Sequence, residues 1–173
     1  AVVELALDEG RIVAGAGALP VRELECELVS GDPAALFALA RRWRARFGLV
    51  LDARSKAERG DALADGRAQA APRGAAAVAL SRKASVDDAW GAVLDESIAQ
   101  VLANASALVV PVTRGRRPHD PEPAEARAAE ALHQLRVGLR RLRCALRLFR
   151  GWVAPAPESL VDGARGLFRR LGA

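Results

Sequence analysis

Three glutamates at every second position form the most distinctive acidic pattern in this sequence. Within VRELECELVS, Glu23, Glu25 and Glu27 alternate with apolar residues. An extended strand sends successive side chains to opposite faces, so this spacing predicts three carboxylates on one face, about 7 Å apart. Aligned like charges repel one another. The pattern therefore has two interpretations: a solvated outer face, or oxygen ligands for Mg²⁺ or Mn²⁺.

A second segment supplies cations. In SKAERG, Lys56 and Arg59 are three residues apart, which places them on one side of a helical turn. Lysine and arginine donate charge-assisted hydrogen bonds to phosphate oxygens. Clustered carboxylates with separate cations favour a site for a metal-bound phosphate chain.

A stripe of basic residues follows one face of a predicted helix near the C-terminus. Its members recur at three- and four-residue spacing beside a leucine seam and span about 25 Å at 1.5 Å per residue. The basic stripe consists of His133, Arg136, Arg140, Arg143, Arg147 and Arg150. It has three interpretations: a solvated face, a nucleic-acid helix, or a groove for polyphosphate or another linear polyanion. Nucleic acid is disfavoured because no aromatic residues are interleaved to stack on bases and tyrosine is absent.

Apolar periodicity, glycine and proline predict the elements that position these residues. The first part is strand-rich and the second helical. In the first part, the predicted elements are a hairpin in 2–14 turning at 8–10, a strand after Pro20, a helix from Asp32 to Gly48 and a short strand at 49–51. An aperiodic segment over 61–80 follows. In the second part, the predicted elements are a helix from Ser85 to about 108, a basic loop at 109–123, a helix over 124–150 and a last helix that begins at 158 and is still running at 173.

Charge and composition restrict the class of protein. The chain of 173 residues carries a net charge of +5, and residues 111–173 alone hold thirteen arginines against six acidic residues. This bias favours a polyanionic partner. No apolar stretch reaches the ~20 residues that a membrane span needs. The two cysteines, Cys26 and Cys144, lack metal-ligand spacing. We therefore expect a cytoplasmic protein in a reduced compartment, with no membrane partner and no specific nucleic acid.

Residues 2–64 resemble the C-terminal half of the CYTH family. The resemblance rests on VELALDEGRI, then LPVRELECELVSGDPAALFALARRW, then SKAERG, in that order. It implies an antiparallel β tunnel that binds a triphosphate with Mg²⁺ or Mn²⁺. On this basis the metal ligands are Glu23, Glu25 and Glu27, the catalytic cations are Lys56 and Arg59, and the substrate-binding residues are Glu4, Asp8, Ser55, Lys56 and Arg59. The family's Glu-x-Glu-x-Lys strand is missing, so we expect a partial domain that is inactive alone.

The segment HQLRVGLRRLRCALRLFR resembles the opening of the CHAD domain, a helical module that binds inorganic polyphosphate. The resemblance covers about residues 84–173. The polyphosphate-binding residues that it implies are His133, Arg136, Arg140, Arg141, Arg143 and Arg147. A CYTH domain followed by a CHAD domain is typical of bacterial inorganic triphosphatases.

The sequence thus predicts an α+β protein: a partial CYTH tunnel over 1–65, a linker over 66–83 and the N-terminal part of an all-α CHAD bundle over 84–173. The expected function is metal-dependent hydrolysis of inorganic triphosphate, with polyphosphate binding by the helical part. The alternative is a polyphosphate-binding protein with a degenerate tunnel. Thiamine triphosphate hydrolysis and cyclic AMP synthesis rank lower, and the oligomeric state is left open.

Overall fold

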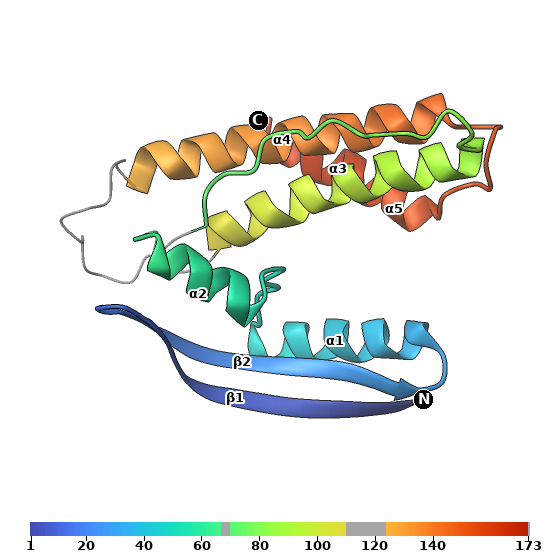
Figure 1. Cartoon of the computed structure of the whole chain (residues 1–173). Coiled ribbons are helices and arrows are strands. Elements are labelled where there is room, and N and C mark those ends of the chain that lie inside the picture. The colour runs from blue at the N-terminus through green and yellow to red at the C-terminus, as the bar shows by residue number, and fades with distance from the viewer. Residues whose placement is uncertain (67–69, 110–123, 173) are drawn as a thin grey trace. The chain divides into compact units, whose positions relative to one another are not determined.

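The computed structural model describes residues 1–66, 70–109 and 124–172, apart from the side chains at 109 and 124. The chain divides into two compact units, Ala1–Gln69 and Ala70–Ala173. The described part of the first unit holds two strands and two helices, and that of the second holds three helices (Figure 1). This mixture of helix and sheet agrees with the predicted α+β class. The described strands form one two-stranded sheet and no closed tunnel.

The sheet is a long antiparallel hairpin of β1 (Val2–Ala14) and β2 (Gly17–Ser30). The prediction of a turn at residues 8–10 is wrong, because Asp8 pairs with Glu23 and Gly10 with Val21 inside the ladder. The chain turns instead at residues 15–16. Gly15 has φ 55°, and a glycine with positive φ at the first of two loop residues suits a tight hairpin.

Helix α1 (Pro33–Phe47) begins and ends where the sequence predicts. The Asp32 carboxylate accepts a hydrogen bond from the Ala34 amide at 2.8 Å, and Pro33 occupies the first turn. Gly48 ends the helix in the left-handed conformation, with φ 63°. Its half-buried face contains Leu36, Leu39 and Trp43.

The predicted short strand at 49–51 is wrong. These residues form neither helix nor strand, and Leu51 is 65% exposed. A strand needs a neighbour for its backbone groups, and the described part of this unit pairs only β1 with β2. Helix α2 (Lys56–Ala64) follows, so the start of the aperiodic segment predicted at 61–80 is helical.

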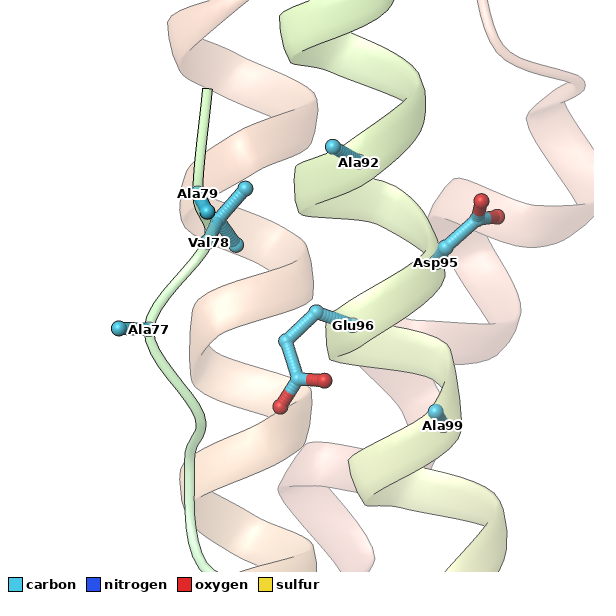
Figure 2. Close-up of a pocket in the computed structure, with 7 residues that line it drawn as sticks. All are labelled: Ala77, Val78, Ala79, Ala92, Asp95, Glu96 and Ala99. Carbon is cyan, nitrogen blue, oxygen red and sulfur yellow. The ribbon is translucent and has the colours of Figure 1, made fainter. Parts of the chain in front are cut away.

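The second unit begins with an extended segment, residues 70–80, that lies along helix α3 (Val86–Val109). Asn104 fixes this segment by accepting a hydrogen bond from the Arg73 amide at 3.0 Å and donating one to the Arg73 carbonyl at 2.8 Å. The Glu96 carboxylate accepts from the Ala76 amide at 2.9 Å. Figure 2 shows Glu96 turned toward the segment and Asp95 turned away, around a shallow pocket of about 340 Å³.

Helix α3 packs along helix α4 (Ala124–Leu148), and helix α5 (Glu158–Arg170) packs on α4 (Figure 1). Helix α3 begins directly after Ser85, close to the predicted start, where a capping interaction joins Ser85 and Asp88: each residue's side chain accepts a hydrogen bond from the other's amide. Helix α5 ends at Arg170, earlier than predicted, with Leu171 as its cap. The buried core comprises Leu135, Leu139, Leu142 and Ala164.

The predicted basic loop at 109–123 lies almost wholly outside the described residues. Within the described ranges, no helix combines the length and the apolar character that crossing a membrane requires.

Candidate functional site

The hairpin gathers its predicted acidic residues on one face. Across the ladder, Glu4 pairs with Glu27 and Asp8 pairs with Glu23, while Glu25 is opposite Ala6. Paired residues in an antiparallel sheet project to the same side, so all five carboxylates share a face. The predicted strand with three same-face glutamates is confirmed.

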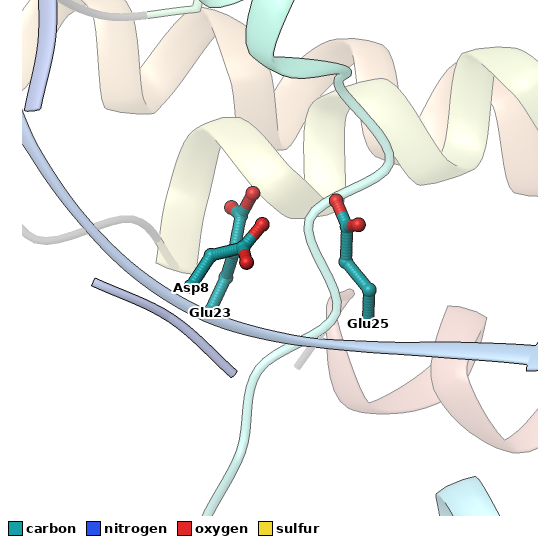
Figure 3. Close-up of side chains that lie close together, drawn as sticks. All are labelled: Asp8, Glu23 and Glu25. Atoms are coloured by element: carbon teal, nitrogen blue, oxygen red, sulfur yellow. The ribbon is translucent and has the colours of Figure 1, made fainter. Parts of the chain in front are cut away.

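Only part of the predicted metal set is gathered tightly. Carboxylate oxygens of Asp8, Glu23 and Glu25 all lie within 4.8 Å of one another, and Figure 3 shows the three side chains reaching to the same side of the hairpin. Glu27 is exposed and lies opposite Glu4, one step along the face. The cluster thus contains Asp8, which was predicted to bind substrate, in place of Glu27.

The ammonium group of Lys56 lies among these three carboxylates. It donates hydrogen bonds to Asp8 and, at 2.6 Å, to Glu25, and it lies 3.0 Å from a Glu23 oxygen. The hydrogen bonds to Asp8, Glu25 and Glu23 raise the pKa of Lys56 above its ordinary value of 10.5. The ammonium group of Lys56 therefore stays charged and occupies the position in which a metal ion would neutralise the three carboxylates.

Arg59 holds the other side of Glu23. One guanidinium nitrogen lies 2.5 Å from Glu23 Oε2, and the Arg59 side chain is only 13% exposed. Burial of Glu23 disfavours its ionised form, but hydrogen bonds from Lys56 and Arg59 outweigh that effect and lower its pKa below 4.5. Because Glu23 and Lys56 both stay charged near neutral pH, a metal ion would compete here with the ammonium rather than with a proton.

The start of α2 positions both cations. Ser55 caps the helix: its Oγ accepts from the Glu58 amide at 3.1 Å, and Glu58 accepts from the Ser55 amide at 2.7 Å. The predicted substrate residue Ser55 thus has a structural contact of its own. Just before it, Arg54 and Asp52 form a bidentate ion pair at 2.9 and 2.7 Å, which was not predicted from the sequence. The D-x-R spacing was the available signal.

The cluster offers the type of ligand that a divalent cation needs, but its side chains as now arranged do not admit an ion. Three carboxylates supply hard oxygen ligands with the charge that Mg²⁺ or Mn²⁺ prefers. Lys56 Nζ stands in their midst, so its side chain has to move aside before an ion can enter. Lys56 is 40% exposed and can swing toward solvent, whereas the largely buried Arg59 cannot move as readily.

The second candidate site is the basic stripe, of which His133 to Arg147 share a face of α4. The predicted helix over 124–150 ends at Leu148, so Arg150 lies beyond it. His133, Arg136, Arg140, Arg147 and Arg150 are exposed. Within the described part of the chain, neither Arg136 nor Arg140 has a side-chain hydrogen bond or ion pair. The guanidinium of Arg143 instead stacks over the Phe168 ring at 4.7 Å, and no carboxylate of the described residues pairs with it.

Arg141 lies apart from the basic stripe and contacts α3. It donates to the Gln100 side chain at 2.8 Å and to the Ala76 carbonyl at 3.2 Å, and it lies 3.7 Å from a Glu96 oxygen. Gln100 is fully buried and also donates to Gln134 at 3.1 Å. Arg141 therefore joins α4, α3 and the extended segment, a contact that helical spacing alone did not predict.

Comparison with known families identifies the part of the chain that carries the basic stripe. Residues 116–173 match the CHAD domain. The match contains all of the basic stripe, α4 and α5, and it begins within residues that the structure does not describe. No solved structure matches this chain. The resemblance of residues 2–64 to the CYTH family stays a prediction.

Proposed function

We propose that this chain binds inorganic polyphosphate along the basic stripe of α4. The observation that carries the proposal is the row of exposed guanidinium groups, with Arg136 and Arg140 lacking acidic partners in the described residues. A linear polyanion lying along the helix can contact these groups in succession, because their spacing follows a single face. The CHAD match over residues 116–173 supports polyphosphate as that polyanion.

Binding of this kind should depend steeply on salt, since each phosphate contact releases counterions. We expect the double variant Arg136→Gln, Arg140→Gln to weaken polyphosphate binding about tenfold or more at moderate salt, and to make the slope of log affinity against log salt shallower by about two contacts. The measurement is a titration of labelled polyphosphate with the full chain at several salt concentrations.

A charge-matched control comes from the other unit. Arg41→Gln, Arg42→Gln removes the same charge from the exposed side of α1 and should leave both the affinity and the slope nearly unchanged. Equal losses in the two double variants would show a general charge effect. Double-stranded DNA that competes as well as polyphosphate at equal phosphate concentration would also overturn the proposal.

A second function, metal-dependent hydrolysis of triphosphate, is favoured by the cluster on the hairpin. Bound Mg²⁺ or Mn²⁺ would polarise the phosphoryl group and lower the pKa of a coordinated water. The residues of this chain would divide the remaining work. Asp8, Glu23 and Glu25 would hold the ion, and Lys56, once displaced from them, would join Arg59 in neutralising phosphate oxygens.

Two glutamates of β2 provide a matched test in the intact protein. Glu25→Gln should lower metal-dependent release of phosphate from triphosphate by about a hundredfold, because it removes one of the three gathered carboxylates. Glu27→Gln should cost less than about fivefold, because Glu27 lies outside the cluster. Equal losses of activity in the two variants would favour Glu23, Glu25 and Glu27 as the metal ligands. Full activity of the Glu25→Gln variant would exclude the cluster as the catalytic centre.

A further inference from the structure

A cavity of about 760 Å³ lies at one end of the second unit, the helical unit of residues 70–173, where the chain turns from α4 into α5. Its wall comes from the last turns of α4, the connection over residues 149–157 and the start of α5, with Trp90 of α3 completing it. Cavities of 300–1,000 Å³ are typical of small-molecule sites. This one contains no residue of the hairpin unit, so it is distinct from the acidic cluster.

The cavity is lined by an excess of positive charge. Arg143, Arg147, Arg150 and Arg165 line it against two acids, Glu158 and Asp162. Asp162 pairs with Arg165 at 3.3 Å, but both side chains are more than half exposed, so this ion pair contributes little. Within the described residues no carboxylate pairs with Arg143, Arg147 or Arg150. An anion entering the cavity would meet guanidinium groups that are free to form bidentate hydrogen bonds.

The rest of the wall is apolar and aromatic. The rings of Trp90 and Phe149 lie 5.3 Å apart between centroids, and Leu146, Val153 and Pro155 extend this surface. An inorganic phosphate chain has no apolar group to place against it. A ligand that joins an anionic group to an aromatic ring could use both parts of the wall, because aromatic side chains stack on planar rings.

From these two halves of the wall we propose that the cavity binds a small organic phosphate that carries an aromatic ring and is about the size of a nucleotide. Its phosphates would contact Arg147, Arg150 and Arg165, and its ring would lie against Trp90. This inference goes beyond polyphosphate binding and does not depend on it, because Trp90 and Arg165 lie outside the basic stripe, which shares only Arg147 and Arg150 with the proposed phosphate contacts.

The test uses the full chain, with ATP, inorganic triphosphate and adenosine as probes. A metal chelator is present so that no metal-dependent hydrolysis occurs. We expect calorimetry to show ATP binding at least about tenfold more tightly than either triphosphate or adenosine, since each of these lacks one half of the ligand. Equal affinity for ATP and triphosphate would contradict a role for the aromatic wall and overturn the proposal.

Variants locate the binding. Arg150→Gln, Arg165→Gln should weaken ATP binding about tenfold, and both side chains are exposed enough for the fold to tolerate the change. Arg136→Gln, Arg140→Gln lies outside the cavity and should leave ATP affinity within about twofold, although it weakens polyphosphate binding. ATP binding that survives the first pair, or falls equally with the second, would place the nucleotide elsewhere and refute the inference.

Discussion

Replacing Gly138 by leucine should destabilise the helical unit by about 3 kcal/mol or more, because it inserts a side chain into a closed helix contact. Gly138 is buried where α4 crosses α3. A Cβ atom at this position would lie 3.1 Å from a Val101 methyl group, 3.2 Å from Gln100 Cγ and 3.3 Å from the Val101 backbone nitrogen. The backbone of α3 cannot yield without separating the helices, and leucine adds three further carbons. The measurement is urea unfolding followed by helical circular dichroism.

The same substitution at Gly163 is the control. Gly163 lies in α5, and a Cβ there would meet no group of the described residues within 4 Å, apart from its chain neighbours and the backbone of its own helix. Gly163→Leu should therefore leave stability unchanged or raise it by up to about 0.8 kcal/mol, the difference in helix propensity. If both variants unfold at the same denaturant concentration, the close approach at Gly138 does not hold α3 and α4 together.

Alanine substitutions at the adjacent residues Arg141 and Arg140 should have opposite effects: the first should lower stability, and the second should lower polyphosphate affinity. Arg141→Ala should cost the helical unit about 2 kcal/mol, because it leaves the buried Gln100 oxygen without its donor and removes a cation that lies 3.7 Å from Glu96. Polyphosphate affinity of the folded variant should change by less than about twofold. Arg140→Ala should lower that affinity several-fold and leave stability within about 0.5 kcal/mol, since Arg140 is exposed.

Thermal unfolding and polyphosphate titration of the two variants together decide the roles. Arg141→Lys adds a further check, because lysine keeps the charge and cannot reproduce the forked contact with Gln100 and Ala76. It should therefore lose most of the stability that Arg141→Ala loses. A variant of Arg141 that melts normally and binds polyphosphate poorly would return this residue to the binding surface.

Local patterns determined much of the secondary structure. Asp32-Pro33 and Gly48 delimit α1 because capping depends on a few neighbouring residues. The alternation of Glu23, Glu25 and Glu27 fixed their common face, since strand periodicity is a local property. The three- and four-residue spacing likewise placed the basic residues from His133 to Arg147 on one side of α4.

The predictions of secondary structure were wrong where a segment's conformation depends on a pairing partner that is distant in sequence. Asp8-Glu9-Gly10 has the composition of a turn, but pairing with residues 21–23 keeps it extended, and the tighter loop at Gly15 turns the chain instead. Leu49–Leu51 has the composition of a strand but lies outside the described sheet, which pairs only β1 with β2. A strand depends on its partner, whereas a capped helix is specified largely by itself.

The sequence by itself determined which residues carry charge and which face each one takes. Only the tertiary structure decided which of them meet. Lys56 reaches Asp8 across 48 positions of sequence and Arg59 reaches Glu23 across 36, so an apparent metal site also holds its own cation. From the sequence, Arg141 was predicted to bind polyphosphate, and Gly138 is a residue of low helix propensity. In the structure both lie at the contact with α3. Such roles depend on the packing of one element against another, which periodicity along a single element does not specify.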